Sequence, residues 1–412
     1  MASSVDLVAG RTAGGTARGT AGETTAGADT LSLSDPYTVP TTYWHRLDDG
    51  RIQCDVCPRA CKLHEGQRGL CFVRGRVDDQ IVLASYGRSS GFCVDPVEKK
   101  PLNHFLPGSS VLSFGTAGCN LACRFCQNWD ISKSREIDTL SSSASPDALA
   151  AAAERLGCRS VAFTYNDPVI FMEYAMDVAD ACRERGIRSI AVSAGYMNAA
   201  PRVEFYEHMD AANIDLKAFT QAFYEKITFS KLPVVLETLE YLKTTGVWFE
   251  ITTLLIPGHN DSDAEIAEES AWLVEHLGTE IPLHFSAFHP DFKMLDVPHT
   301  PPETLRRARR IAREHGLRYV YTGNVHDPDG QTTTCPTCGK PIVVRDWYVI
   351  ERYQVTDTGA CAHCGTRLPG RFDGPVGGWG SRRLPVRLAD PNLPGAGRHD
   401  RRVPAGAGPG GA

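Results

Sequence analysis

The stretch that decides the fold is residues 118–128, GCNLACRFCQN, in which Cys119, Cys123 and Cys126 have C-x3-C-x2-C spacing. It follows a short apolar run at 111–114, so we expect the three cysteines in a loop directly after a strand. Thiolates are the ligands that proteins offer to iron–sulfur clusters. Three ligands on a four-iron cluster leave one iron open to a small molecule, as in catalytic rather than structural metal sites. The alternatives are an incomplete zinc site or three cysteines buried as small hydrophobic residues.

With Phe125 before the third cysteine, the segment reads C-x3-C-x-aromatic-C and resembles the signature of the radical S-adenosylmethionine (SAM) superfamily. The flanking GCN and CQN resemble the branch that contains pyruvate formate-lyase activating enzymes. Within that branch the sequence is most similar to the AmmeMemoRadiSam system radical SAM enzymes, from about Cys54 to about Val325. The resemblance implies a [4Fe-4S] cluster on the three cysteines, with SAM bound at its open iron.

Length and composition set broad limits on the protein. A chain of 412 residues can hold two or three domains, or one large α/β barrel with additions, and 42% hydrophobic residues suffice for a core. The net charge of −6 gives no electrostatic reason to expect a nucleic-acid or membrane partner. We find no apolar run near the ~18 residues of a membrane span, and no apolar signal core at the N-terminus. We therefore expect a cytoplasmic protein.

Beyond residue 110 the sequence alternates between strand-like and helix-like patterns. Parallel strands joined by right-handed helical crossovers are the usual result of such alternation. The number of units approaches but does not reach the eight of a closed barrel. We predict an α/β fold with a partial (β/α)6 TIM-type barrel over residues 105–325, which the resemblance also implies. The expected strands are 111–114, 160–165, 188–193, 212–216, 247–256, 282–288 and 319–321, and the expected helices are 146–156, 169–185, 201–208, 233–245, 262–277 and 302–315.

The regions outside this barrel differ in composition. Residues 1–40 are rich in Ala, Gly, Thr and Ser, and we expect them to be disordered. A cysteine-rich N-terminal segment occupies 46–100, and its run Glu98-Lys99-Lys100 is interpreted as a solvated surface without a chemical role. A zinc-ribbon-like module is predicted at 331–370. The Gly-, Pro- and Arg-rich residues 374–412 are interpreted as a flexible basic tail.

The N-terminal segment contains four closely spaced cysteines, Cys54, Cys57, Cys61 and Cys71. Clustered cysteines without a secretion signal favour metal binding over disulfides. Zinc would close such a site tetrahedrally. A second iron–sulfur cluster would use the same ligands. The spacing does not choose between the two metals, and unligated thiols are the third alternative.

The C-terminal module contains two C-x2-C pairs, Cys335 with Cys338 and Cys361 with Cys364. This pattern predicts a zinc site of the ribbon type, with a hairpin between the pairs. A segment of about forty residues cannot stabilise itself by burial alone. Zinc binding in such modules supplies about 10–16 kcal/mol of apparent free energy. A redox Cys-x-x-Cys pair is the alternative, but no thioredoxin-like βαβ pattern surrounds it.

Two candidate SAM contacts follow the second and third expected strands. The segment 164–168, TYNDP, stands where activating enzymes have a Gly-Gly-Glu-Pro motif, with Tyr165 and Asn166 in place of the glycines and Asp167 in place of Glu. The resemblance implies that Asp167 is the acceptor for the SAM ammonium group. Its alternative role is an ordinary Asn-Asp-Pro turn. Ser193 is expected to hydrogen-bond the ribose or carboxylate of SAM. A turn built on the backbone freedom of Gly195 is the alternative there.

Further candidates follow the fourth and sixth strands. Asp215 and Lys217 point to the same face of a strand and resemble the Asp-x-Lys motif of activating enzymes. We expect them to bind the amino-acid part and the ribose of SAM, and a structural salt bridge is the alternative. His289 stands where the resemblance implies a contact with the methionyl part of SAM. A structural histidine is the other interpretation.

These features together predict a radical SAM enzyme, an oxidoreductase of activating-enzyme type. It would cleave SAM reductively and abstract a hydrogen atom from a protein or small-molecule substrate. The resemblance implies a one-electron donor of flavodoxin or ferredoxin type, a glycyl radical on a protein substrate, and companion proteins of the AmmeMemoRadiSam system. The alternative is a zinc-stabilised binding or scaffold protein without redox catalysis, which would be colourless rather than brown.

Overall fold

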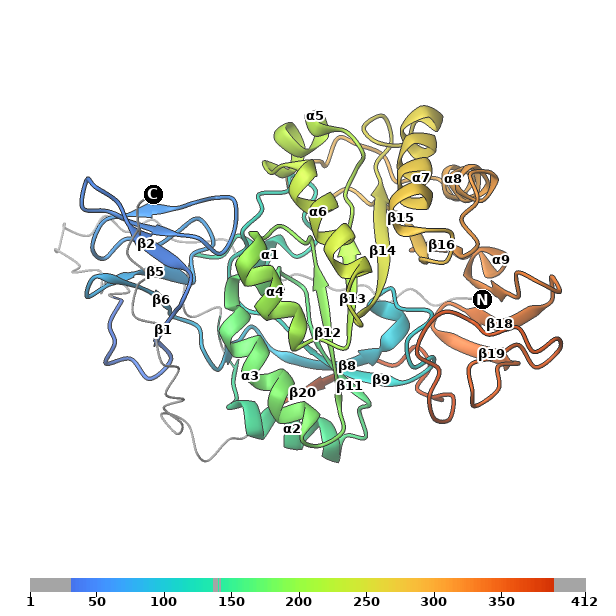
Figure 1. Ribbon diagram of the computed structural model, residues 1–412, viewed down its shortest axis with the longest axis horizontal. Coiled ribbons are helices and arrows are strands. Elements are labelled where there is room, and N and C mark those ends of the chain that lie inside the picture. The colour runs from blue at the N-terminus through green and yellow to red at the C-terminus, as the bar shows by residue number, and fades with distance from the viewer. Residues whose placement is uncertain (1–30, 136–139, 141, 389–412) are drawn as a thin grey trace, which may run out of the picture. The chain divides into compact units, whose positions relative to one another are not determined.

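The computed structural model describes residues 31–135, 140 and 142–388 of the chain. Its central feature is a nine-stranded sheet in which seven neighbouring strands run parallel. These seven follow one another across the sheet in chain order (Figure 1). They are β9 (Ser110–Phe114), β11 (Ser160–Phe163), β12 (Arg188–Ser193), β13 (Ala211–Asp215), β14 (Trp248–Leu255), β15 (Leu283–Ala287) and β16 (Val320–Gly323).

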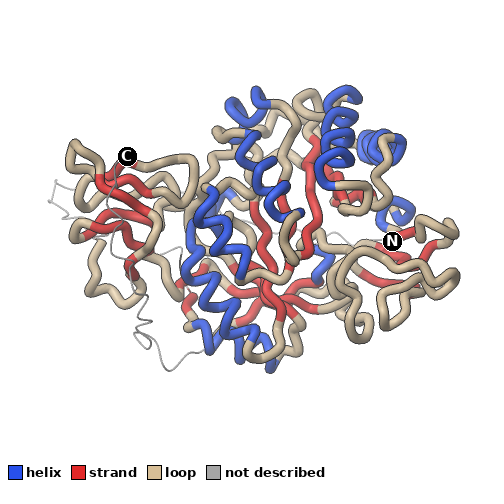
Figure 2. Tube along the Cα trace, in the orientation of Figure 1, coloured by secondary structure: helices blue, strands red, loops and turns tan. Residues whose placement is uncertain are grey.

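Helices connect the parallel strands and flank the sheet (Figure 2). Two of them, α2 and α7, begin at a serine cap that the sequence predicts: the Oγ of Ser145 accepts from Ala148 N, and the Oγ of Ser262 accepts from Glu265 N. In the described residues, no helix combines the length and apolar character that a membrane span requires. The connecting helices are α2 (Pro146–Arg155), α3 (Met172–Arg183), α4 (Ala199–Glu207), α6 (Leu232–Lys243), α7 (Asp263–Leu277) and α8 (Pro302–Glu314).

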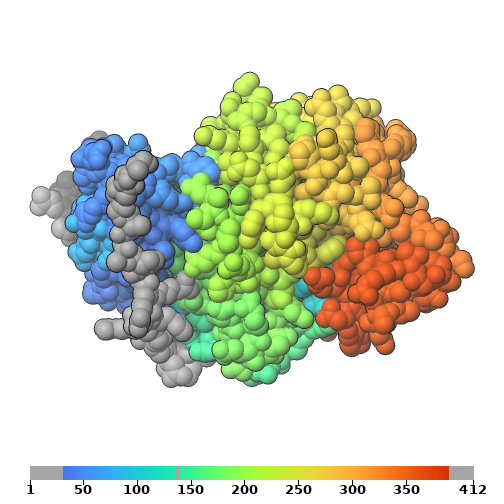
Figure 3. Space-filling view, in the orientation of Figure 1, coloured from blue at the N-terminus to red at the C-terminus, as the bar shows by residue number. Residues whose placement is uncertain are grey.

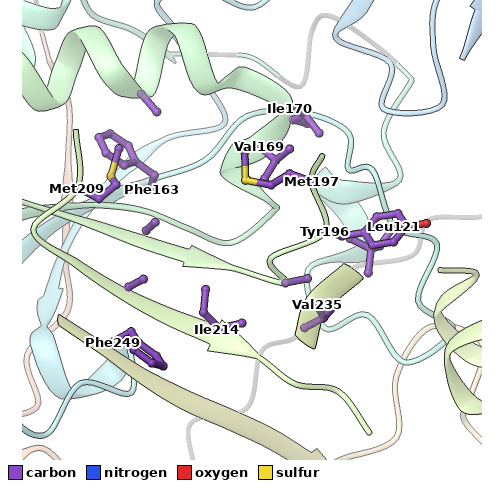
Figure 4. Close-up of a cluster of buried hydrophobic side chains, with 14 of the residues drawn as sticks. Leu121, Phe163, Val169, Ile170, Tyr196, Met197, Met209, Ile214, Val235 and Phe249 are labelled. Atoms are coloured by element: carbon purple, nitrogen blue, oxygen red, sulfur yellow. The ribbon is translucent and has the colours of Figure 1, made fainter. Parts of the chain in front are cut away.

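The strand–helix repeat confirms the α/β class and the positions of the expected strands. The order of hydrogen-bonded strands ends at β16 on one side, so closure into a partial barrel remains a prediction. The strands of the sheet are largely buried, and most of their side chains share a core with the helices. Figure 4 shows part of that core, with Phe163, Ile214 and Phe249 on strands and Val235 on α6. A second, smaller cluster joins residues of β9, β11 and β12 to apolar residues that precede β9.

Short elements lie in the connections between the larger ones. The strands β7 (Arg88–Ser89) and β10 (Ser142–Ser143) pair with each other. The π-helical turn η4 follows α5 directly, and η3 leads into α3. The remaining short helices are η1 (Val97–Lys99), α1 (Trp129–Ser132), η3 (Pro168–Phe171), α5 (Gln221–Phe223), η4 (Tyr224–Thr228) and α9 (Pro328–Gln331).

The N-terminal segment forms two small antiparallel sheets. One contains β1 (Val39–Pro40), β6 (Gln80–Leu83) and β5 (Arg74–Val77). The other contains β2 (Trp44–Arg46), β3 (Ile52–Cys54) and β4 (Lys62–Leu63). Of the region expected to be disordered, residues 1–30 lie outside the described residues, whereas residues 31–40 are described and include β1.

The main sheet extends beyond the predicted barrel on the β9 side. Strand β8 (Phe92–Pro96), from the cysteine-rich segment, pairs antiparallel with β9. Strand β20 (Leu384–Val386) in turn pairs with β8. It lies in the segment from 374 that we expected to be a flexible tail, while residues 389–412 lie outside the described residues. Pairing between strands this far apart in the chain leaves no local sequence signal.

The interpretation of the run at 98–100 as a solvated surface is wrong. Lys100 is 2% exposed and its Nζ donates to the buried carboxylate of Asp95 at 2.8 Å. Glu98 is also buried, and its Oε1 accepts from Gly108 N at 2.7 Å. Both charges lie where the chain turns from β8 toward β9. A buried charge requires a partner, and here the partners come from other segments.

The C-terminal module is a small three-stranded sheet with a core of its own. It contains β17 (Thr333–Thr334), β18 (Pro341–Asp346) and β19 (Val349–Tyr353), and the β18–β19 pair confirms the expected hairpin. In the space-filling view its orange-red surface is continuous with the neighbouring part of the α/β unit (Figure 3).

Candidate metal and SAM site

The three cysteines of the opening motif lie in the loop that leaves β9 at the carboxyl edge of the sheet. The backbone of this loop is constrained at Gly118, which has φ +82°. A Cβ at this position would overlap the carbonyl oxygen of Cys71. Glycine is therefore required both by conformation and by the close approach of the N-terminal segment.

Side chains from the neighbouring strand ends hold this loop in place. Asn166, after β11, donates from Nδ2 to Gly118 O at 2.7 Å and accepts from Thr116 N at 3.0 Å. Asn120 within the loop is buried and donates to Tyr196 O, after β12, at 2.9 Å. The sequence analysis did not assign a role to Asn166. Its only signal was that it replaces a motif glycine of activating enzymes.

Burial and neighbouring groups set the electrostatics of Cys119 and Cys123. Burial raises the pKa of Cys123 to about 12, and the nearby thiols of Cys126 and Cys119 contribute to the increase. Burial also raises the pKa of Cys119, with a contribution from the Asp167 carboxylate. The positive charge of Lys217 opposes the increase at Cys123 by lowering the pKa of that thiol. Soft thiolates close together and shielded from water suit an iron–sulfur cluster, so these residues fit the group.

Asp167 and Ser193 lie together, as their positions after adjacent strands predict. The Ser193 Oγ donates to Asp167 Oδ1 at 2.8 Å, and Ala194 N donates to Asp167 Oδ2 at 2.9 Å. Asp167 also accepts from Val169 N, which is the capping role of a simple turn. Burial raises the pKa of this carboxyl. Asp167 therefore joins the ends of β11 and β12 through hydrogen bonds to backbone and hydroxyl groups. Its carboxylate also lies close enough to Cys119 to raise the pKa of that thiol.

Asp215 and Lys217 form an ion pair that faces the cysteine loop. The Lys217 Nζ donates to Asp215 Oδ2 at 2.9 Å and lies 5.8 Å from the centroid of the Phe125 ring. Burial by itself lowers the pKa of Lys217, but the Asp215 carboxylate and the Cys123 thiol outweigh burial and raise it. Phe125 itself is buried and packs near Phe223. The structure thus places the predicted contacts Asp215 and Lys217 beside Phe125 of the metal loop.

His289 differs from the other candidates. Its side chain is exposed, and its recorded partners are the Pro290 carbonyl oxygen at 3.4 Å and the His299 ring at 6.3 Å. The same segment nevertheless contacts the metal loop, because Lys293 N donates to Arg124 O at 3.0 Å. The structure brings the His289 segment to the loop but does not place its imidazole against the other candidates.

The four C-terminal cysteines form a compact group. The Sγ atoms of Cys335 and Cys364 are 3.6 Å apart, and those of Cys338 and Cys361 are 3.8 Å apart. All four sulfurs lie within 4.8 Å of one another. A tetrahedral zinc site with Zn–S bonds of about 2.3 Å has sulfurs separated by about 3.8 Å. The geometry of this group therefore fits a single zinc-sized ion.

The four N-terminal cysteines share a cavity, and their thiols influence one another. Burial raises the pKa of Cys71 to about 12, opposed by Arg74 and reinforced by the thiols of Cys54 and Cys61. Burial and the other three thiols likewise raise the pKa of Cys57. The predicted grouping of these residues is therefore present in the fold.

A known protein family matches a region of the chain that contains the metal loop. The family described as the Radical SAM superfamily matches residues 114–270. Among curated proteins, the chain is 37% identical over 329 residues to "Uncharacterized protein MJ0808" of Methanocaldococcus jannaschii. The matched region covers 79% of this chain and 97% of that protein.

Several solved structures are similar to parts of the chain. A domain of a pyruvate-formate lyase-activating enzyme from Bacteroides vulgatus is 16% identical, with a TM-score of 0.36, covering 40% of this chain and 98% of that one. SuiB of Streptococcus suis, solved with its precursor peptide SuiA, is 15% identical, with a TM-score of 0.43, covering 56% and 52%. A radical SAM methyltransferase from Sphaerobacter thermophilus is 16% identical, with a TM-score of 0.43, covering 69% and 76%. These similarities concern the fold alone.

Proposed function

We propose that this chain, which belongs to the same family as the Methanocaldococcus jannaschii protein and contains a radical SAM superfamily domain, is a radical SAM enzyme. The observation that carries the proposal is the loop after β9, which presents Cys119, Cys123 and Cys126 beside the Asp215–Lys217 pair. A radical SAM domain implies a [4Fe-4S] cluster and SAM. Three thiolates then leave one iron for SAM.

A reduced cluster bound by the three cysteines would supply the electron that splits SAM into methionine and a 5′-deoxyadenosyl radical, which takes a hydrogen atom from the substrate. The protein positions the ligands and excludes water. The side chains of Phe125 and Asn120, both in the loop, are buried. Asn166 fixes the backbone that leads into Cys119. These contacts would orient the loop whose three thiolates hold the cluster.

The polar groups at the strand ends would hold SAM against that iron. Lys217 keeps its positive charge at neutral pH, because its pKa is raised, and suits the carboxylate of the methionyl part. Asp215 suits the ammonium group or the ribose hydroxyls. Ser193 and Asp167 supply a hydroxyl and a carboxylate one strand away. We assign His289 to the methionyl part, which requires its exposed side chain to turn toward the loop.

A protein substrate is the most specific part of the proposal. An apolar surface lies beside the metal loop: Trp129 is 45% exposed and stacks on Phe292 with ring centroids 5.7 Å apart. Leu295 in the same segment is 71% exposed. Such side chains suit a polypeptide partner. We propose hydrogen abstraction from a protein, glycyl-radical formation included, with an electron donor of flavodoxin or ferredoxin type and companion proteins of the AmmeMemoRadiSam system.

The test is SAM cleavage by the anaerobically reconstituted protein. With dithionite and SAM we expect equal amounts of 5′-deoxyadenosine and methionine, and their loss by at least about 100-fold in Cys123→Ala, because the cluster loses a ligand. Cys158→Ala is the matched control, since it removes a buried thiol outside the three cysteine groups. No 5′-deoxyadenosine from protein with an intact cluster spectrum would contradict the proposal. Colourless protein containing zinc alone would favour the scaffold alternative.

A further inference from the structure

Four cysteines outside the radical SAM motif converge on one cavity. Cys54 ends β3, Cys57 and Cys61 lie in the turn between β3 and β4, and Cys71 precedes β5. All four line the same cavity, whose empty volume is ≈ 390 Å³, partly open to solvent. The space lies between the small N-terminal sheets and η3, because Val169 and Ile170 also line it.

The spacing of these sulfurs differs from that of the C-terminal group. In the part of the chain that the structure describes, the Cys335 group is the set whose ligand atoms all lie within 4.8 Å of one another. The N-terminal thiols do not form a second such set among the described residues. A zinc ion held by four thiolates needs sulfurs about 3.8 Å apart, as the C-terminal group has them. Four thiolates around a wider space suit a cluster, whose irons and sulfides separate its protein ligands.

Two arginines line the cavity, and one of them carries an N–H without a partner in the described part of the chain. Arg59 donates from Nε to Asn120 O at 2.7 Å, while its buried Nη2 has no hydrogen-bond partner among the described residues. Arg74 lines the same cavity, and its guanidinium pairs with the buried Glu173 and donates to Ile170 O at 2.9 Å. An unpartnered buried N–H is costly unless a ligand accepts from it. A cluster with four thiolates carries net negative charge, and its sulfurs accept hydrogen bonds.

The cavity lies directly beside the radical SAM loop. Asn120, the neighbour of Cys119, lines it together with Arg59. Cys71 contributes from the other side, since its carbonyl oxygen packs against Gly118. The two cysteine groups are thus in contact through backbone and side chain, although sixty-one positions separate Arg59 from Asn120.

We propose that Cys54, Cys57, Cys61 and Cys71 ligate an iron–sulfur cluster, additional to the cluster on the three loop cysteines, and not a zinc ion. With four protein ligands this cluster has no open iron, so it exchanges electrons and does not bind SAM. The site requires iron and sulfide but not SAM cleavage. It can therefore be tested separately from the proposed function.

The first experiment locates iron by variants of the whole chain reconstituted anaerobically. Cys119→Ala/Cys123→Ala/Cys126→Ala should keep about half of the wild-type iron and sulfide and show a reducible cluster by electron paramagnetic resonance (EPR). Cys54→Ser/Cys57→Ser should lose the other half, and Cys335→Ser/Cys338→Ser should lose zinc but no iron. The proposal is overturned if the triple variant loses all its iron, or if zinc remains after the Cys335→Ser/Cys338→Ser change.

A second measurement on the wild-type protein covers the case in which a variant fails to fold. The reduced protein should show two iron–sulfur components by Mössbauer spectroscopy, and SAM should shift only one of them. A single component that accounts for all the iron overturns the proposal. Two components without any 5′-deoxyadenosine would instead support the second cluster and contradict the proposed reaction.

Discussion

The two groups of four cysteines occupy opposite edges of the same sheet. The N-terminal group lies at the carboxyl edge, where Asn198, after β12, donates to Asp55 O at 2.7 Å. The C-terminal module lies at the amino edge, where Arg345 donates to Asn103 O, before β9, at 2.8 Å. In parallel α/β sheets chemistry gathers at the carboxyl edge. Two sets of four cysteines thus differ in their spacing and in the edge of the sheet at which they lie, and we propose different roles for them.

The C-terminal group is the structural one of the two. Its small core, which includes Ile342, Val343 and Leu368, is too limited to fold alone. A metal ion held by its four cysteines would supply the missing stabilisation. Buried contacts through Arg345 attach the module to the sheet. The N-terminal group contacts the reactive loop through Arg59 and Gly118.

The largest expected effect is the unfolding of the C-terminal module without its metal. Cys335→Ser should remove on the order of 10 kcal/mol of metal-linked stability from the module, and limited proteolysis should cut within residues 331–373. Formation of 5′-deoxyadenosine should fall by no more than about threefold, because the module lies at the edge opposite the metal loop. Loss of SAM cleavage together with an intact iron content would contradict the separation of roles.

Arg345 tests how the module is attached to the sheet. Its buried guanidinium donates to Thr333 and Asn103, and its Nε lies 3.7 Å from the buried Glu98 carboxylate. Arg345→Met should lower the free energy of unfolding by about 3–5 kcal/mol, because Glu98 is left without its cation. Arg352→Met, on the exposed side of β19, is the control and should change it by less than about 0.5 kcal/mol. Equal effects of both changes in urea unfolding would refute the anchoring role.

Gly118 tests the contact between the N-terminal group and the reactive loop. Gly118→Ala should destabilise the protein by at least about 2 kcal/mol and reduce iron at both clusters, because the new Cβ displaces the Cys71 backbone. Gly186→Ala has a similar φ, +68°, but open space around its Cβ, and should cost about 1 kcal/mol. The difference between the two losses of stability measures the effect of the close contact between Gly118 and the Cys71 backbone. Full iron content in Gly118→Ala would show that the loops do not depend on each other.

The smallest effect concerns the sheet that supports both groups. Burial raises the pKa of Glu269 on α7 to about 8, and Thr253 of β14 donates to it. The folded protein therefore holds this proton more tightly than the unfolded chain, so stability falls as pH rises from about 4.5 toward about 8. From about pH 6 to about pH 7 the loss should be about 1 kcal/mol. Urea unfolding of Glu269→Gln should show no such loss of stability between these pH values. An unchanged dependence of stability on pH in this variant would contradict the raised pKa of Glu269 as its cause.

Local signals in the sequence were sufficient for the strand–helix repeat. Apolar runs such as 160–163 and caps such as Ser145 and Ser262 act within a few residues of the chain. The three-cysteine loop was equally local. The pairing of β20 with β8 was not predictable in this way, because it joins segments almost three hundred positions apart.

The same limit applied to the candidate site. That Lys100 is buried depends on Asp95 and on the fold around both, not on the charge run itself. The hydrogen bonds from Asn166 to the metal loop likewise join segments that meet only in the folded chain. The same is true of the cavity that the N-terminal cysteines share. The spacing of these cysteines left their metal open, and the second cluster that we propose there rests on three-dimensional geometry.

The central claim is that one iron on the Cys119 loop has no protein ligand and binds SAM. Electron–nuclear double resonance on the reduced protein tests it directly, with SAM labelled by ¹⁵N at the amino group and ¹⁷O at the carboxylate. The account predicts hyperfine coupling from both labels to the cluster, and loss of both couplings in Cys123→Ala. An intact reduced cluster that shows no coupling to either label would contradict it.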